Sequence, residues 1–457
     1  MSYHNVKGTK DIYNSEAKAY QYVENLMSAV ADIYGYSEMR PPILEHTEVF
    51  TRSVGESSDV VRKEMYTFFD KGERSLTLRP EFTAGIMRVI TQNKLYATQD
   101  LPIKVFYNGP VFRYERPQLG RYRQFNQFGV ECLGGTNYLH DVEVIALGYT
   151  ILSSLGLEGV KIKINSLGDA ASRDAYRQAL KDYFKDKIDN MCEDCKARFE
   201  TNPLRILDCK VPEDQEVVKG APKMFDFLSL ESKERFDKVL SALEEMEIPF
   251  GVDESLVRGL DYYSETVFEY HLISDKGLDY GAIGGGGHYA DLIKEFGGPA
   301  LEGIGFSFGV ERVISLLEDN NLIEKDESSC DLYVIPLNAE CQPTAMSLVT
   351  YLRCESYRAD INLEGGKMPA QIKRALRKGA KYALIIGEDE INNETIIVKD
   401  LANNSQESVP FDDLLDYLDA KQGDECGCGC HHEHEHEEGE EHHCCCHHHD
   451  DSDKGDK

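Results

Sequence analysis

The stretch from Val111 to Glu131 constrains the fold of this 457-residue chain more than any other part of the sequence. Apolar and aromatic residues alternate with polar ones in its first and last thirds, and its middle, residues 117–120, reads PQLG. Alternation with a period of two is typical of strands, and proline with glycine marks a turn. The stretch therefore predicts two antiparallel strands joined by a loop.

The same stretch carries four arginines and two glutamates. The residues that we expect to project from its strands are Arg113, Glu115, Arg121, Arg123, Gln127 and Glu131. Guanidinium groups match the geometry of phosphate and carboxylate oxygens, so this density favours a polyanionic ligand held against a sheet. A salt-bridged hairpin that faces water is the alternative, because charged strands commonly face solvent.

Composition indicates an ordinary globular protein of two or three domains, with 41% apolar and 29% charged residues. No apolar run is long enough for a signal peptide or a membrane span, so we expect a cytoplasmic protein with no membrane partner. The net charge is -31, and the residues from Lys421 onward contribute 3 Lys and 12 Asp or Glu, or -9, which leaves -22 on the body. Any RNA contact must therefore depend on local basic patches.

Seven of the 13 cysteines are scattered through the body, a distribution that favours reduced thiols over a disulfide framework. Cys192 and Cys195 have the spacing C-x-x-C, and Cys209 follows. This spacing is compatible with zinc, but no fourth ligand is evident nearby in the sequence. The pattern therefore favours ordinary thiols over a metal site.

Three further stretches combine a strand with polar or glycine-rich residues. Residues 76–84 predict a strand that turns into a helix, with Glu81 and Thr83 at the turn as helix caps or as acceptors for a ligand. Residues 256–263 precede a strand-rich run and a glycine-dense turn at 284–289, which no βαβ unit surrounds, so a dinucleotide site is not indicated. Residues 303–312 predict a strand that leads into a helix.

Taken together, these motifs resemble the class II aminoacyl-tRNA synthetases, in the form found in the histidyl-tRNA synthetase family. Phe112-Arg113-x-Glu115, a loop and Phe125 resemble motif 2, and residues 303–312 resemble motif 3. A helix, a strand and the prolines at 41–42 resemble motif 1, while RGLDYY at 258–263 and GGGGHY at 284–289 resemble the two histidyl signatures. The chain departs from the second signature at His288, Ala290 and Asp291.

The resemblance extends to about Leu418 and implies an α/β (α+β) fold. We expect an antiparallel-sheet catalytic domain at 1–325 with a helical insertion at about 166–250, and a small α/β anticodon-binding domain at 330–420. The remaining residues, 421–457, predict a disordered acidic tail rich in His and Cys. The resemblance also implies a homodimer.

The family's site residues are carried over residue by residue. The resemblance implies histidine binding by Glu81, Thr83, Arg113, Gln127, Glu131, Arg258, Tyr262 and Tyr263. It implies ATP binding, with Mg2+, by Arg113, Glu115, Arg121, Phe125, Arg258 and Arg312. The implied function is that of a histidine-tRNA ligase, which forms histidyl-adenylate from L-histidine and ATP and transfers histidine to the 3′ end of tRNA(His).

Two regions are candidates for touching tRNA. Arg116 and Gln118 lie on the motif 2 loop and would meet the acceptor end. In the helix predicted from Pro369, basic residues share one face and Ile372, Leu376 and Gly379 the other. The basic candidates for an RNA backbone contact are Arg374, Arg377 and Lys378.

The tail is a separate candidate for metal binding, because 15 of the 24 residues from Cys426 to His449 are Cys or His. Thiolate and imidazole are ligands for Zn or Ni. The candidate ligands are Cys426, Cys428, Cys430, His431, His432, His434, His436, His442, His443, Cys444, Cys445, Cys446, His447, His448 and His449.

Two alternatives to a synthetase remain. One is the catalytically silent paralogue that regulates ATP phosphoribosyltransferase, which usually lacks the C-terminal domain and much of the charged site. The other is a metal-storage protein, which only the tail suggests.

Overall fold

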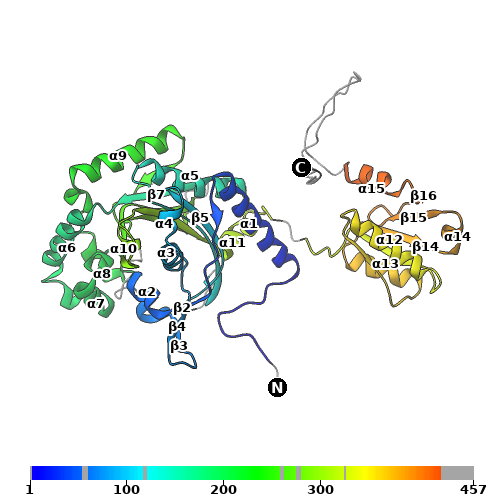
Figure 1. Cartoon of the computed structure of the whole chain (residues 1–457), viewed down its shortest axis with the longest axis horizontal. Coiled ribbons are helices and arrows are strands. Elements are labelled where there is room, and N and C mark those ends of the chain that lie inside the picture. Colours follow the sequence, from blue (N-terminus) through cyan, green and yellow to red (C-terminus); the bar gives the residue numbers. More distant parts are fainter. Residues whose placement is uncertain are drawn as a thin grey trace, which may run out of the picture. The chain divides into compact units, whose positions relative to one another are not determined.

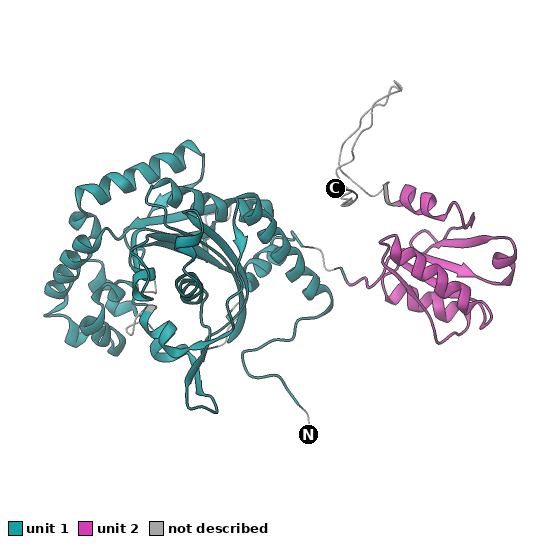
Figure 2. Ribbon diagram, viewed as in Figure 1, with its two compact units in different colours: residues 1–326 teal, residues 327–457 magenta. Residues whose placement is uncertain are grey.

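The computed structural model describes residues 3–53, 60–116, 121–257, 262–273, 279–323 and 326–423. The chain divides into two compact units, residues 1–326 and 327–457, coloured separately in Figure 2. No helix within the described ranges has both the length and the apolar character needed to cross a bilayer.

The described part of the first unit is built on a large sheet with the strand order β1-β5-β6-β11-β10-β9-β7-β8. The β1 and β8 strands at its two edges pair parallel with their neighbours, and the strands between them pair antiparallel. A smaller sheet has the order β2-β4-β3. The bounds are β1 (Ser37–Glu38), β2 (Leu44–His46), β3 (Tyr66–Phe69), β4 (Ser75–Leu78), β5 (Ile103–Phe112), β6 (Gln124–Leu133), β7 (Val160–Ser166), β8 (Phe250–Val252), β9 (Tyr263–Ile273), β10 (Asp279–Tyr289) and β11 (Gly303–Gly309).

Helices cover both faces of the large sheet. On one face α1 (Asn14–Ile33), α5 (Leu139–Ser154), α9 (Leu230–Glu245) and α11 (Val310–Asp319) enclose the main apolar core. On the other face α3 (Thr83–Gln92) packs inside the curve of the sheet (Figure 1), together with α10 (Leu292–Glu295). Nearby lie α2 (Thr47–Ser53), the π-helical turn η1 (Val60–Glu64) and α4 (Leu95–Thr98).

The hairpin predicted for residues 111–131 is confirmed as β5 and β6, which pair antiparallel with Val111 opposite Phe125. The prediction that Arg113, Glu115, Arg121 and Arg123 project from the strands is wrong, because β5 ends at Phe112 and β6 begins at Gln124. Side chains along β6 point alternately to the two faces of the sheet, so every second residue lies on the same face. Phe128 and Val130 belong to the core beneath α1 and α5, whereas Leu133 packs on the face that carries α3. Gln127 and Glu131 have the parity of Leu133, so the same alternation places them on the α3 face.

The predicted helical insertion is confirmed as a bundle of short helices between β7 and β8, drawn in green in Figure 1. Tyr176, Leu180 and Phe184 share a buried face of its first helix, as their spacing predicts. The bundle consists of α6 (Ala170–Phe184), η2 (Ile188–Asn190), α7 (Glu193–Thr201), η3 (Pro203–Asp208), α8 (Pro212–Val218) and η4 (Met224–Phe227), followed by α9.

The second unit has a mixed sheet with the order β13-β12-β14-β15-β16, which confirms the small α/β fold expected after the catalytic domain. Parallel pairing joins β12 to β13 and β14, and antiparallel pairing adds β15 and β16. The bounds are β12 (Leu332–Pro336), α12 (Gln342–Cys354), β13 (Ala359–Ile361), α13 (Met368–Arg377), β14 (Tyr382–Ile386), α14 (Glu388–Asn392), β15 (Thr395–Asp400), β16 (Gln406–Pro410) and α15 (Leu414–Gly423).

Two further local predictions, on a glycine-rich segment and on a helix face, are wrong. The glycine-dense segment 284–287 is not a turn but the interior of β10, where glycine is required because β11 approaches closely: a Cβ on Gly286 would lie 1.8 Å from the Gly305 carbonyl oxygen. Leu376, expected on the apolar face of α13, is 53% exposed, whereas Gln371 is buried. Gln371 occupies that buried position because its amide donates to the carbonyls of Pro336 and Gly366.

Candidate active site

A cavity of about 460 Å³ opens on the α3 face of the large sheet. Its walls come from β5, β6, β10 and β11, from the start of α3, and from η1 and η3. The histidine-site candidates among its lining residues are Glu81, Thr83, Arg113, Gln127, Glu131, Tyr262 and Tyr263, and the ATP-site candidates are Arg113, Arg121 and Phe125. Residues from four separate parts of the chain therefore meet in one hollow.

Glu131 lies in the wall of this cavity and is only 2% exposed. Its Oε1 accepts a hydrogen bond from the Thr83 hydroxyl over 2.7 Å, and its Oε2 accepts one from the Tyr289 hydroxyl over 2.7 Å. The Tyr107 hydroxyl lies 3.5 Å from Oε1. These hydroxyl donors fix the orientation of the carboxylate without neutralising its charge.

Glu81 is a second buried carboxylate in the cavity, 4% exposed, at the turn before α3. Its Oε1 accepts from the Ala84 amide over 3.0 Å, which caps the helix, while its Oε2 is buried without a hydrogen-bond partner within the described residues. The capping role predicted for Glu81 is confirmed at Oε1, and its role as an acceptor for a ligand stays a prediction. One oxygen serves the helix, and the other is available to a donor in the cavity.

The acid-base behaviour of both carboxylates follows from their burial. Burial raises the pKa of Glu131 to about 7, although the Thr83 and Tyr289 hydroxyls oppose the rise. Burial also raises the pKa of Glu81, against the Ala84 amide and the Arg113 charge. Within the described residues neither carboxylate forms an ion pair, so a cationic ligand would stabilise both in their charged forms.

Two arginines of the hairpin supply positive charge to the same cavity. Arg113 donates from Nε to the Pro80 carbonyl over 2.8 Å, and its guanidinium lies 5.4 Å from the centre of the Phe125 ring. Arg121 lines the cavity and lies 3.6 Å from the Glu115 carboxylate. Glu115 does not line the cavity, but it holds the Arg121 guanidinium beside it. Arg123 instead lies over the Tyr114 ring, 3.8 Å from its centre.

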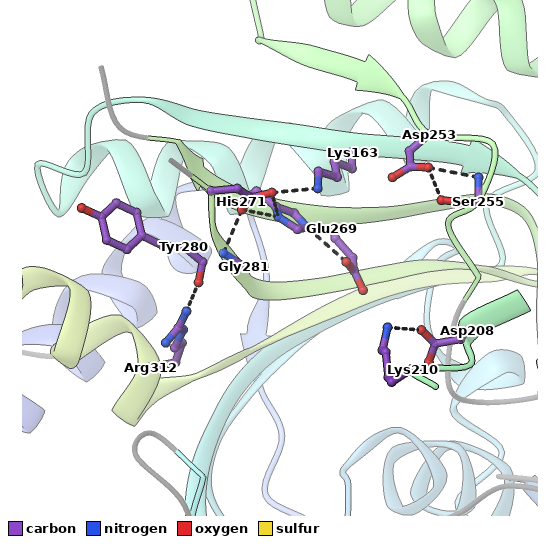
Figure 3. A network of polar contacts seen from close by, with 11 residues as sticks. Lys163, Asp208, Lys210, Asp253, Ser255, Glu269, His271, Tyr280, Gly281 and Arg312 are labelled. Atoms are coloured by element: carbon purple, nitrogen blue, oxygen red, sulfur yellow. Dashed lines mark hydrogen bonds and ion pairs between the residues drawn. The ribbon is translucent and has the colours of Figure 1, made fainter. Parts of the chain in front are cut away.

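Arg312 follows β11 at the start of α11, as the sequence predicts. Its Nη2 donates to the carbonyl oxygen of Tyr280 (Figure 3). Arg312 is outside the set of described residues that line the cavity, but Tyr280 precedes the lining residue Ala282 by only two positions on β10. The guanidinium is therefore held near the edge of the cavity.

Several cavity residues were not among the sequence candidates. Tyr107 and Tyr289 contact Glu131 from β5 and β10, and Gly284 and Gly285 line the cavity with backbone. Arg205 reaches the cavity from η3 in the insertion. The alternation of side chains along β5 and β10 could have indicated that the two tyrosines face the cavity. No sequence pattern indicated that Arg205 lies there, because tertiary contacts bring the insertion back to the cavity.

His288 belongs to the opposite face of β10, where its Nδ1 lies 3.1 Å from Asp141 of α5. Asp141 is also contacted by Arg235 over 3.1 Å and by the Thr266 hydroxyl over 2.9 Å. Burial lowers the pKa of His288, but the Asp141 carboxylate outweighs this and raises it to about 9. This departure from the family signature therefore places a buried cation between the sheet and α5, away from the cavity.

The tRNA candidates differ in what they contact. Arg374 donates to Asn362 Oδ1 over 2.6 Å and Lys378 pairs with Asp360, so both are engaged inside the second unit. Arg377 is exposed and contacts a backbone carbonyl of its own helix over 3.4 Å, and Arg116 is exposed beside the hairpin. Arg258, Gln118 and the tail candidates at 426–449 lie outside the described residues.

The fold and the cavity define the catalytic domain of a class II aminoacyl-tRNA synthetase. The features that do so are a mostly antiparallel sheet, a charged hairpin, buried carboxylates and an arginine where a strand leads into a helix. The family described as histidyl-tRNA synthetase matches residues 8–313, and an anticodon binding domain matches residues 331–421. The chain belongs to the histidyl-tRNA synthetase family.

Individual relatives agree with this assignment. The chain is 45% identical over 421 residues to a histidine–tRNA ligase of Geobacillus sp. (strain WCH70), covering 92% of this chain and 99% of that protein. It is 46% identical to a histidine–tRNA ligase of Bacillus licheniformis, with 92% of this chain and 99% of that protein covered. The crystal structure of apo histidyl-tRNA synthetase from S. aureus superposes with a TM-score of 0.77 at 37% identity, covering 91% of this chain and 99% of that one.

Proposed function

We propose that this chain activates L-histidine with ATP and transfers the histidyl group to the 3′ end of tRNA(His). The observation that carries the proposal is the pair of buried carboxylates, Glu81 and Glu131, that face a cavity also lined by Arg113 and Arg121. Such a cavity suits a ligand with two cationic or proton-donating groups at one end and a polyanion at the other.

The amino acid is recognised at the carboxylate end. The α-ammonium group of histidine donates to Glu81 Oε2, and the imidazole ring donates to Glu131, whose position is fixed by Thr83 and Tyr289. Tyr262, Tyr263 and Gln127 line the rest of this pocket. A pocket built to pair a polar side chain rejects an analogue that lacks it by roughly 10⁴-fold or more in favourable cases.

The nucleotide is held at the arginine end. ATP enters as its magnesium complex, and Arg113 and Arg121 stabilise negative charge on its phosphates while Phe125 stacks on the adenine. Arg312, held near the cavity edge by Tyr280, reaches the outer phosphate, and Arg258 completes the charge around the reacting carboxylate. Glu115 orients Arg121 and accepts from the adenine amine.

The first chemical step is attack by the histidine carboxylate on the α-phosphorus, with pyrophosphate as the leaving group. A carboxylate is ionised at neutral pH, so this step needs positioning and positive charge and no general base. In the second step a hydroxyl of the terminal ribose of tRNA attacks the histidyl carbonyl carbon, and AMP leaves. Arg116 and Gln118 on the motif 2 loop contact that end of the tRNA.

The remaining parts of the proposal concern partners. The second unit binds the anticodon stem through exposed basic residues, among which Arg377 is the best placed. The chain works in the cytoplasm as a homodimer, as the family implies. The tail binds Zn or Ni and has no part in catalysis.

The test is exchange of labelled pyrophosphate into ATP by the purified chain, with each of the twenty amino acids in turn. We expect exchange with histidine alone. Exchange with no amino acid would overturn the proposal in favour of the regulatory paralogue, and exchange with a different amino acid would overturn the role given to Glu131.

A further inference from the structure

Four potential metal ligands meet inside the helical insertion. Cys192 caps the start of α7, Cys195 lies within α7, Cys209 follows η3 and Asp214 lies in α8. One ligand atom from each residue lies within 4.8 Å of the others. The sequence interpretation that no fourth ligand was evident is therefore wrong, because α8 returns an aspartate to the three thiols.

The separation of two sulfurs in this cluster is close to that of a tetrahedral zinc site, and the four ligand atoms all lie within 4.8 Å of one another. Zinc bound to thiolate sulfur at about 2.3 Å, in tetrahedral geometry, places neighbouring sulfurs about 3.8 Å apart. Cys192 Sγ and Cys209 Sγ are 3.9 Å apart, and Cys209 Sγ lies 3.2 Å from Asp214 Oδ2. The two sulfurs are far beyond the roughly 2.05 Å of a disulfide bond, and each of the three cysteines is a free thiol.

Asp214 is a buried carboxylate that pairs with no cationic side chain in the described part of the chain. The carboxylate is 3% exposed, and within the described residues its hydrogen-bond donors are the Cys192 amide, at 3.1 and 3.3 Å, and the Cys209 thiol. Cys195 and Cys209 are as buried as the apolar residues around them. Buried carboxylates are usually paired with a cation or coordinate a metal, and the surrounding described residues offer Asp214 no cationic side chain.

Backbone amides donate hydrogen bonds to two of the sulfurs, as they do around thiolates that coordinate a metal. The Cys195 amide donates to Cys192 Sγ over 3.4 Å, and the Val211 amide donates to Cys209 Sγ over 3.5 Å. Such outer contacts orient metal ligands and stabilise negative charge on sulfur.

We propose that Cys192, Cys195, Cys209 and Asp214 bind one zinc ion in a closed, structural site. All four positions are occupied by protein ligands, so the ion has no open position for substrate and acts by joining α7, η3 and α8. The proposal does not depend on the proposed function.

The site has a consequence for the cavity, because η3 lies between Cys195 and Cys209 in the chain and carries Arg205. Arg205 lines the cavity, and its carbonyl accepts from Arg198 Nη1 of α7 over 3.1 Å. Asp194 of α7 also pairs with Lys63 of η1 over 2.8 Å, and η1 lines the cavity through Val60 and Glu64. Loss of the ion would therefore loosen one wall of the cavity without removing a residue from it.

The test uses the full chain, and metal content is its primary readout. Asp214→Ala removes one ligand, while Asp214→His and Asp214→Cys replace it with ligands that are common in structural zinc sites. After equilibration with a weak chelator, we expect Asp214→Ala to hold about one zinc fewer per chain than the unchanged protein, and the other two variants to retain it. Because the tail is the same in all four proteins, its metal cancels in the comparison. Equal zinc in all four would overturn the proposal.

A second measurement locates the ion and does not depend on any variant folding. An anomalous difference map at the zinc absorption edge, from crystals of the full chain, should show a peak about 2.3 Å from three sulfurs of the insertion. A map without an anomalous peak between the four ligand residues, or a disulfide between Cys192 and Cys209, would overturn the proposal. Pyrophosphate exchange should fall in Asp214→Ala and recover in Asp214→His, and failure of exchange in every protein would count against the proposed function and not against the metal.

Discussion

The Thr83 hydroxyl donates to Glu131 Oε1 over 2.7 Å, which joins the first residue of α3 to the middle of β6. A carboxylate held in this way has one geometry before any ligand arrives. Its partners are neutral hydroxyl groups, so its charge remains available to a ligand.

Replacing Glu131 with Gln keeps the size of the side chain and removes the charge. We expect kcat/KM for histidine in pyrophosphate exchange to fall by roughly 10²-fold or more, because the buried negative charge that pairs with the imidazole is lost. The KM for ATP should change little. Glu143→Gln is a matched control, because Glu143 pairs with Lys104 over 2.7 Å and is not part of the cavity. A normal KM for histidine in Glu131→Gln would contradict the assignment.

The raised pKa of Glu131 predicts how histidine use depends on pH. With a pKa of about 7, the carboxylate gains a proton as pH falls through neutrality. We therefore expect kcat/KM for histidine to decline on the acid side of about pH 7, as measured from exchange rates across pH. The decline should be absent from the residual activity of Glu131→Gln, and its persistence there would assign it to another group.

The same burial predicts a stability cost. A carboxyl group whose pKa is raised on folding favours the folded state while protonated, so its unfavourable contribution develops as pH rises from about 4.5 to about 7. Glu131→Gln should raise the free energy of unfolding of the ligand-free protein at about pH 8 and have less effect at about pH 5. Urea denaturation at both pH values checks this, and a variant less stable at the higher pH would contradict it.

His288 predicts the opposite behaviour. Its pKa is raised to about 9, so its pairing with Asp141 stabilises the fold fully below the unfolded value of 6.5 and is lost as pH rises through about 9. His288→Ala should lower the free energy of unfolding by about 2 to 3 kcal/mol more at about pH 6 than at about pH 10. An equal loss at both pH values, in urea denaturation, would show that packing alone is involved.

Removing everything after Lys421 should leave tRNA charging unchanged, because both matched domains end by residue 421. Most bound Ni or Zn should be lost with the tail ligands, while the zinc of the insertion remains. Aminoacylation rates check the expectation about charging, and metal content checks the expectation about metal binding. A large loss of charging would contradict the view that the tail has no catalytic part.

Reversing the charge of Arg377 should weaken tRNA use alone. Arg377→Glu places a negative charge on the exposed side of α13, so we expect the KM for tRNA to rise several-fold while pyrophosphate exchange is unchanged. The exchange reaction needs no tRNA and serves as the internal control. An unchanged KM for tRNA would move the RNA contact to another surface.

Local patterns in the sequence were sufficient for much of this structure. The alternation from Val111 to Glu131 predicted the hairpin and, through its parity, the side chains that share a face with Glu131. The small α/β domain expected near the end of the chain is likewise present, as the mixed sheet of the second unit. The sequence does not predict β16, because Val409 alone of its five residues is buried at this sheet edge and one buried residue makes no pattern.

The errors arose where distant segments decide the outcome. Gly286 resembles a turn residue until Gly305 is known to lie against it, and Asp214 resembles a surface acid until α8 is folded onto the three thiols. Gln371 is polar in sequence yet buried, because two carbonyls from elsewhere satisfy its amide. Pairings of this kind depend on topology, and a one-dimensional pattern does not contain them.

The most direct measurement is a crystal structure of the chain with histidine and a non-hydrolysable ATP analogue. The imidazole should lie within hydrogen-bond distance of Glu131, the α-ammonium group should contact Glu81 Oε2, and the phosphates should contact Arg113. An imidazole ring bound away from Glu131, or phosphates that contact neither Arg113 nor Arg121, would contradict the site described for this chain.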